Sequence, residues 1–247
     1  MRHARQRANG ALELQDVSFA YDGVPVLRHF TLRLEPGTVA VVAGGDGGGK
    51  TTLARVAAGF LRPAAGRVAF AGRDMTFCPA HRFARAGIVL AAPELVNGRL
   101  TVADNLRLAA RYGAGATGLA LSRLVAAALG RFPDLARRTA QPAASLSSGQ
   151  RVMLCIARAL CAAPRVLILD EPGIGLFADT LGRVAAVVAE TAAAGGAVLI
   201  TEADPGHWGY PAVTLGGRAP AAPAPPAGDP TIRPAARRPP GAQARRG

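Results

Sequence analysis

Lysine is almost missing from this chain of 247 residues. The sequence holds 29 lysines and arginines, and Lys50 is the one lysine among them. Cysteine is scarce too: the 3 cysteines have no metal-ligand spacing, so we expect free thiols in a reducing cytosol. No apolar stretch approaches the roughly 20 residues of a membrane span. The arginine-bearing N-terminus has no apolar segment behind it, so we expect no secretory signal.

Acidic residues are also few, and the formal net charge is +13. Such a balance can indicate a nucleic-acid partner. Here, however, much of the excess lies in residues 1–10 and in the Pro/Ala/Arg-rich residues 219–247. We therefore predict a basic N-terminal extension, a disordered tail and no specific nucleic-acid partner. Such a tail is either a solvated extension or a contact for anionic lipid or nucleic acid.

The single lysine belongs to a glycine-rich motif that fits the phosphate-binding pattern G-x-x-x-x-G-K-[ST]. Glycines let successive N–H groups point at phosphates, the ammonium of Lys50 fits between phosphate oxygens, and Thr51 offers a hydroxyl to Mg²⁺. A plain glycine-rich turn is the alternative, but it does not explain the Lys-Thr pair. The residues predicted to bind phosphate are Gly44, Gly45, Asp46, Gly47, Gly48, Gly49, Lys50, Thr51 and Thr52.

Apolar periodicity predicts an alternation of strands and helices. Strands are expected over residues 12–19, 30–34, 38–43, 66–70, 87–92, 166–169 and 197–201. Helices are expected after the glycine loop and over 102–112, 146–161 and 176–193, with helical character between about 115 and 145. This order predicts an α/β fold with a parallel core sheet, a small antiparallel β portion and a helical insert.

Two further segments carry candidate chemistry. The apolar strand before residue 170 ends in Asp170 and Glu171. Asp170 is a candidate ligand for Mg²⁺ and Glu171 a candidate general base, although a solvated acidic turn is the alternative. Residues 147–150 open a helix, where exposed N–H groups could bind an anion or a serine could simply cap the helix. The residues of this second segment are Ser147, Ser148, Gly149 and Gln150.

In this order and spacing, the three motifs resemble the ATP-binding subunit of ABC transporters over roughly residues 11–218. The resemblance implies a P-loop NTPase fold with a helical subdomain at about 95–160, the cofactors ATP and Mg²⁺, and catalytic roles for Lys50 and Glu171. It also implies that Tyr21 stacks on adenine. The alternative for this residue is an aromatic at the edge of the core.

The branched-chain amino-acid type of this family is the most similar. Residues 79–88, 92–94 and 131–138 carry that likeness. It implies amino-acid transport, and it implies that Glu94 senses the γ-phosphate and the membrane partner. The spacing from Glu94 to Thr101 is shorter than usual in the family.

The resemblance also implies partners. Two ATP-binding subunits, identical or different, would hold two ATP molecules head to tail, with the Lys50 side of one and residues 147–150 of the other at each nucleotide. Membrane permease subunits would complete the transporter. The chain would then be peripheral, on the cytoplasmic face of the cell membrane.

The chain departs from the family pattern at several positions. Ala203 stands where most members have a histidine after the last core strand, and His207 follows four residues later. Gly45 and Asp46 replace the usual proline and asparagine, and the aspartate expected after Glu171 is missing. We expect intact ATP binding, weakened if Asp46 faces the phosphates, and slow hydrolysis. Two alternatives remain: a hydrolysis-poor regulatory subunit that uses ATP as a dimer clamp, and a soluble ABC-type ATPase.

Overall fold

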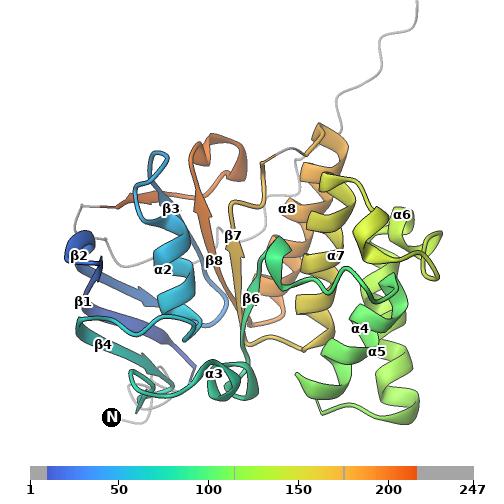
Figure 1. Ribbon diagram of the computed structural model, residues 1–247, viewed down its shortest axis with the longest axis horizontal. Coiled ribbons are helices and arrows are strands. Elements are labelled where there is room, and N and C mark those ends of the chain that lie inside the picture. The colour runs from blue at the N-terminus through green and yellow to red at the C-terminus, as the bar shows by residue number, and fades with distance from the viewer. Residues whose placement is uncertain (1–9, 114, 175, 216–247) are drawn as a thin grey trace, which may run out of the picture.

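The computed structural model describes residues 10–113, 115–174 and 176–215. They form two sheets and a group of helices (Figure 1). The antiparallel sheet has the order β2-β1-β4-β5, formed by Val24–Leu34, Leu12–Tyr21, Ala65–Phe70 and Arg73–Asp74. The parallel sheet has the order β6-β7-β8-β3-β9, formed by Ile88–Ala91, Val166–Asp170, Ala197–Glu202, Val39–Ala43 and Ala212–Thr214.

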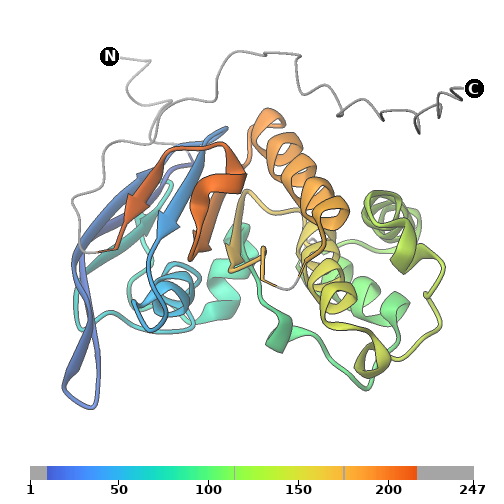
Figure 2. The ribbon, with the colours of Figure 1, turned by 90° about the horizontal axis from the view of Figure 1, so that it is seen from above.

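The helices cover both faces of the parallel sheet. They are α2 (Lys50–Ala57), α3 (Ala80–Ala86), α4 (Val102–Tyr112), α5 (Gly118–Arg131), α6 (Pro133–Ala136), α7 (Ser148–Cys161) and α8 (Ala178–Ala193). Short 3-10 turns are η1 (Pro93–Leu95), η2 (Ala143–Ser145) and η3 (Pro205–Trp208). In Figures 1 and 2, α2 lies on the side of the antiparallel sheet, whereas α7 and α8 cover the opposite face, with α4 to α6 beyond them.

The strands of the parallel sheet are apolar on both faces because both faces are covered. Their side chains alternate between two hydrophobic cores. Val41, Leu167 and Ile200 belong to the core under the helices α4 to α8. Ala40, Ile168 and Leu199 belong to the core shared with α2 and the antiparallel sheet. The sheet thereby joins the two halves of the molecule.

The predicted α/β architecture is confirmed, with differences in detail. The helix over 102–112 has the predicted bounds, whereas α7 begins at Ser148 because Ser147 caps it, and α8 begins at Ala178. Strand β2 begins at Val24, earlier than predicted, because its outer half pairs with β1. The elements α3, β5 and β9 were not predicted. They are short, and only their neighbours in space stabilise them.

Among the described residues, no helix combines the length and apolarity needed to cross a bilayer. The tail predicted over residues 219–247 and all but Gly10 of the predicted N-terminal extension lie outside the described residues.

Candidate functional site

The glycine loop lies between β3 and α2, the arrangement that the sequence predicted. Two of its glycines have no room for a side chain. Gly49 has a left-handed backbone (φ 92°), and a Cβ there would lie 2.9 Å from Cγ1 of Val26. A Cβ on Gly48 would lie 2.9 Å from the carbonyl oxygen of Gly45. Glycine is therefore required for the loop to curl tightly in front of the helix N-terminus.

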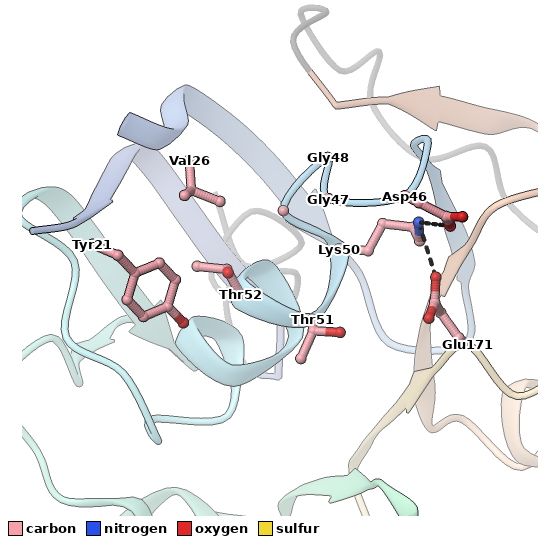
Figure 3. A pocket seen from close by; sticks show the side chains of 10 residues that line it. Tyr21, Val26, Asp46, Gly47, Gly48, Lys50, Thr51, Thr52 and Glu171 are labelled. Atoms are coloured by element: carbon pink, nitrogen blue, oxygen red, sulfur yellow. Dashed lines mark ion pairs between the residues drawn. The ribbon is translucent and has the colours of Figure 1, made fainter. Parts of the chain in front are cut away.

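A cavity of about 340 Å³ opens over this loop (Figure 3). It brings the loop together with one end of β1 and with the residue that follows β7. Most of the predicted phosphate-binding residues line it, and Val26 is a lining residue that the sequence did not indicate. The lining residues are Tyr21, Val26, Asp46, Gly47, Gly48, Gly49, Lys50, Thr51, Thr52 and Glu171.

The ammonium of Lys50 is the centre of charge in this cavity. The side chain is 4% exposed, and Nζ donates hydrogen bonds to the carbonyl oxygens of Gly44 and Gly45, both at 2.8 Å. Nζ also lies 2.9 Å from Oε1 of Glu171 (Figure 3). A buried ammonium needs such partners. An incoming phosphate would compete with the carboxylate for the same cation.

Asp46 adds a second carboxylate near Lys50. Its Oδ1 lies 4.0 Å from Nζ, and its side chain is fully exposed to solvent. The carboxylate therefore does not face away from the cavity, so its charge opposes that of an anionic ligand.

Asp170 ends β7 beside the loop. Oδ1 accepts a hydrogen bond of 2.6 Å from the hydroxyl of Thr201. Burial raises the pKa of the Asp170 carboxyl, and hydrogen bonds from the hydroxyls of Thr201 and Thr51 partly oppose this shift. A carboxylate and a hydroxyl are ligands that Mg²⁺ prefers, and Mg²⁺ usually takes few protein ligands besides phosphate and water. The pair Thr51 and Asp170 therefore fits the predicted metal, although the described residues hold no cluster of three or more His, Cys, Asp or Glu.

Glu171 adopts a left-handed backbone (φ 48°), which is unusual for a residue other than glycine. Its N–H donates to the carbonyl oxygen of Thr201 at 2.9 Å. This conformation turns the chain sharply after β7 and directs the carboxylate toward Lys50, as Figure 3 shows. Strain of this kind clusters at functional sites.

Tyr21 lies at the other end of the cavity and is 44% exposed. Its ring packs edge-on against Phe19, with a centroid distance of 4.9 Å. Tyr21 is thus a partly exposed aromatic side chain in the cavity lining, as an aromatic platform requires.

The segment 147–150 does not line this cavity. Ser147 and Gln150 form a reciprocal cap: the Ser147 hydroxyl accepts from the N–H of Gln150 at 3.3 Å, and Oε1 of Gln150 accepts from the N–H of Ser147 at 3.1 Å. The capping alternative is therefore realised in this chain. Anion binding by Ser148 and Gly149 stays a prediction.

Glu94 also lies outside the cavity lining. It sits on η1, and its Oε1 is 3.0 Å from Nη2 of Arg55, which belongs to the last turn of α2. This hydrogen bond raises the pKa of the Arg55 guanidinium. The ion pair links the helix that follows the glycine loop to the start of the helical region.

The end of β8 holds a buried acid that the sequence did not single out. Glu202 is 3% exposed; its Oε2 accepts a hydrogen bond of 3.1 Å from the N–H of Gly173, and its Oε1 accepts one of 3.2 Å from the N–H of Ala203. Nε2 of His207 lies 3.8 Å from Oε2. Neither Glu202 nor His207 lines the cavity. No spacing in the sequence signals this contact, because η3 folds back to make it.

Residues 27–173 match the family model described as ABC transporter. This span contains the glycine loop, the capped helix start and the two carboxylates. The chain belongs to the ABC transporter family. Its members are ATP-binding cassettes that generally hydrolyse ATP, and the P-loop NTPase fold expected from the resemblance is confirmed.

The cassette is similar to proteins that are named for different transported compounds. It is 39% identical over 176 residues to the mycobactin import ATP-binding/permease protein IrtA of Mycolicibacterium thermoresistibile, covering 67% of this chain and 18% of that protein. It is 36% identical over 171 residues to a putative 2-aminoethylphosphonate import ATP-binding protein PhnT of Salmonella typhimurium, covering 68% and 44%. The cassette thus spans less than half the length of these relatives.

Solved structures share the fold. An ATP-binding subunit of an ABC transporter superimposes with a TM-score of 0.73 at 26% identity, covering 83% of this chain and 85% of that one. A dimeric bacterial ABC transporter cassette superimposes with a TM-score of 0.75 at 19% identity, covering 83% and 94%. The second likeness concerns the fold alone.

Proposed function

We propose that this cassette binds ATP with Mg²⁺, hydrolyses it, and thereby powers a membrane transporter. The observation that carries the proposal is the convergence of Lys50 and Glu171 in one cavity over a glycine loop. A cation for phosphate and a carboxylate for water are the two groups that hydrolysis of a phosphoanhydride needs side by side.

Binding is divided among the lining residues. The N–H groups of the loop and the N-terminus of α2 receive the phosphates, and Lys50 supplies the point charge. Tyr21 offers its ring to the adenine. Thr51 and Asp170 would hold Mg²⁺, which when bound neutralises charge on the phosphates.

Glu171 has two states in this proposal. Without nucleotide its carboxylate neutralises Lys50 at 2.9 Å. Phosphate then takes over the ammonium, and the carboxylate is released to accept a proton from an attacking water as general base. The left-handed backbone keeps it at the cavity in both states.

A second cassette, identical or different, completes the site. Ser148 and Gly149 belong to the first turn of α7, where backbone N–H groups lack helical partners and favour an anion. They do not reach the cavity of their own chain, so we assign them to the nucleotide of the neighbouring subunit. Two ATP molecules would then join two cassettes head to tail.

A membrane permease is the second proposed partner. An apolar groove of about 510 Å³ lies between α3, α4 and α7. Phe60, Leu108 and Tyr112 line it and are 48%, 40% and 71% exposed. Exposed apolar area of this kind favours a protein partner. Leu95, next to Glu94, also lines it, so the Arg55–Glu94 ion pair connects the groove to the glycine loop. The cassette would then be peripheral at the cytoplasmic face of the membrane.

The proposal extends to the transported solute and to the rate of ATP hydrolysis. The likeness of residues 79–88 to the branched-chain type favours amino acids. Ala203 in place of a histidine, and Asp46 beside Lys50, favour slow turnover. The same two features favour the second candidate, a regulatory cassette that uses ATP as a dimer clamp.

The testing experiment is purification of the tagged protein from detergent-solubilised membranes, followed by identification of what accompanies it. Co-purification of a polytopic permease and ATP turnover that Glu171→Gln abolishes would support the transporter. A protein that enters only the soluble fraction would support a soluble ATPase. ATP-dependent dimers of equal lifetime in wild type and Glu171→Gln would support the regulatory clamp.

A further inference from the structure

We propose that Glu202 is a positioning residue, which with His207 holds Gly173 and so fixes the turn that presents Glu171 to the nucleotide. This inference rests on the proposed ATPase function and adds to it a role for the end of β8. Glu202, His207 and Gly173 together form a unit that we call the clasp.

The turn after β7 needs support because Glu171 adopts a left-handed backbone (φ 48°). Such a conformation is energetically unfavourable for a residue other than glycine and persists only where the surroundings impose it. Two residues at the end of β8 accept hydrogen bonds from this turn. The N–H of Glu171 donates to the carbonyl oxygen of Thr201, and the N–H of Gly173 donates to Oε2 of Glu202.

The acid of the clasp is buried, and its oxygens are occupied by backbone donors. A glutamate that is 3% exposed is costly unless it is hydrogen-bonded and paired. Each carboxylate oxygen of Glu202 accepts one backbone N–H, from Gly173 and from Ala203. The imidazole of His207 lies 3.8 Å from Oε2 and pairs with it when protonated. One carboxylate oxygen thus holds the turn after β7, and the other binds the backbone directly after β8.

Little space is left around Gly173 for a side chain. A Cβ built on this residue would lie 2.8 Å from Oε2 of Glu202 and 3.0 Å from Nε2 of His207. Glycine allows the turn to approach both side chains closely. A larger residue would force the ends of the Glu202 and His207 side chains to shift and would disturb the hydrogen bond between Glu202 and the N–H of Gly173. Glu171 lines the cavity whereas Glu202 and His207 do not, so we assign these two residues an action through Glu171.

The first test is hydrogen exchange of the nucleotide-free full chain, measured on peptides that contain Gly173. Glu202→Ala should speed exchange at this amide, whereas Glu202→Gln should preserve protection there when its single amide oxygen accepts from Gly173 in place of Ala203. Unchanged protection in Glu202→Ala would overturn the clasp. Hydrogen exchange does not depend on ATP turnover. If the wild-type protein did not hydrolyse ATP, the proposed function would be refuted, and hydrogen exchange would still test the clasp.

The second test separates turnover from binding. A misplaced general base can cost on the order of 10²-fold in rate. Glu202→Ala should therefore lower kcat by up to this factor with the Kd for ATP unchanged, and Glu202→Gln should restore most of the loss. The matched control is Glu190→Ala, which removes a glutamate paired with Arg131 on the helical side. A parallel loss of kcat and ATP affinity, or wild-type kcat in Glu202→Ala, would overturn the proposal.

Gly173→Ala keeps the test valid if Glu202→Ala does not fold. The added methyl should displace the Glu202 carboxylate from the N–H of Gly173 and lower kcat in the same way. If Glu202→Ala does fold, the two losses should not add in the double variant, because both break one contact. Fully additive losses would mean that the residues act separately and would overturn the clasp.

Discussion

The ammonium of Lys50 and the carboxylate of Glu171 form an ion pair of 2.9 Å, so the two candidate catalytic groups neutralise each other. Lys50 is nearly fully buried, and Glu171 is the carboxylate closest to it. The pair therefore couples the release of the candidate base to the arrival of an anion.

Replacing Glu171 by Gln should separate binding from turnover. The amide has no charge with which to compete for Lys50, so ATP should bind as tightly or more tightly. Phosphate release should fall by roughly 10²- to 10⁴-fold, the usual contribution of a general base. Equilibrium binding of a fluorescent ATP analogue and a phosphate-release assay measure the two effects. Lys50→Ala, which should lose binding itself, is the comparison, and normal turnover in Glu171→Gln would exclude the assigned role.

Asp46→Asn should strengthen ATP binding. Its carboxylate lies 4.0 Å from Nζ of Lys50 and faces the cavity, so removing the charge removes repulsion of phosphate. Because the side chain is exposed, the gain should be a few-fold at low salt and should shrink as salt rises. Titrations at two salt concentrations measure it. Asp179→Asn, in the first turn of α8, is the control, and a gain of equal size there would mean a general effect of net charge.

Asp170→Asn should stabilise the nucleotide-free protein in a pH-dependent manner. Burial raises the pKa of Asp170 above its ordinary value of 3.8, so the folded state binds the proton more tightly than the unfolded state. The wild type therefore loses stability as pH rises from 3.8 through the folded pKa, and the variant avoids this loss. Urea denaturation at about pH 4.5 and about pH 7.5 should show a larger advantage of the variant at the higher pH. An advantage that is equal or smaller at the higher pH would contradict the burial argument.

The cysteines should differ sharply in reactivity. Burial raises the pKa of both Cys155 and Cys161 to about 12, whereas Cys78 is only partly buried. The thiolate is the reactive form, so the two buried thiols should resist iodoacetamide at about pH 8. Intact-mass spectrometry should find modification at Cys78 first and complete labelling only in denaturant. Rapid labelling of Cys155 in the folded protein would indicate that α7 opens locally.

Local pattern and motif predicted most of this molecule. The glycine loop, the carboxylates and the apolar strands are contiguous in sequence, and contiguous signals depend little on distant partners. The ring of Tyr21, which lines the cavity, was expected from the family resemblance.

Long-range contacts were the part that the sequence did not reveal. Strand β9 exists because Ala212–Thr214 pairs with β3, and Glu202 meets Gly173 because β8 pairs with β7 up to the turn that follows β7. Such contacts have no period and no fixed spacing. The pairing of Lys50 with Glu171 is of the same kind, since it joins the segments that follow β3 and β7, the two strands on either side of β8.

The place of β3 in the parallel sheet has a consequence for synthesis of the protein. Its neighbours on both sides are β8 and β9, which come from the last part of the described chain. Until Ala197–Thr214 leaves the ribosome, β3 has no strand paired with either edge. The glycine loop that follows β3 is then not yet held in place by the sheet. Such unpaired apolar strands are prone to aggregate. The nascent chain must therefore carry an incomplete nucleotide pocket for most of its synthesis.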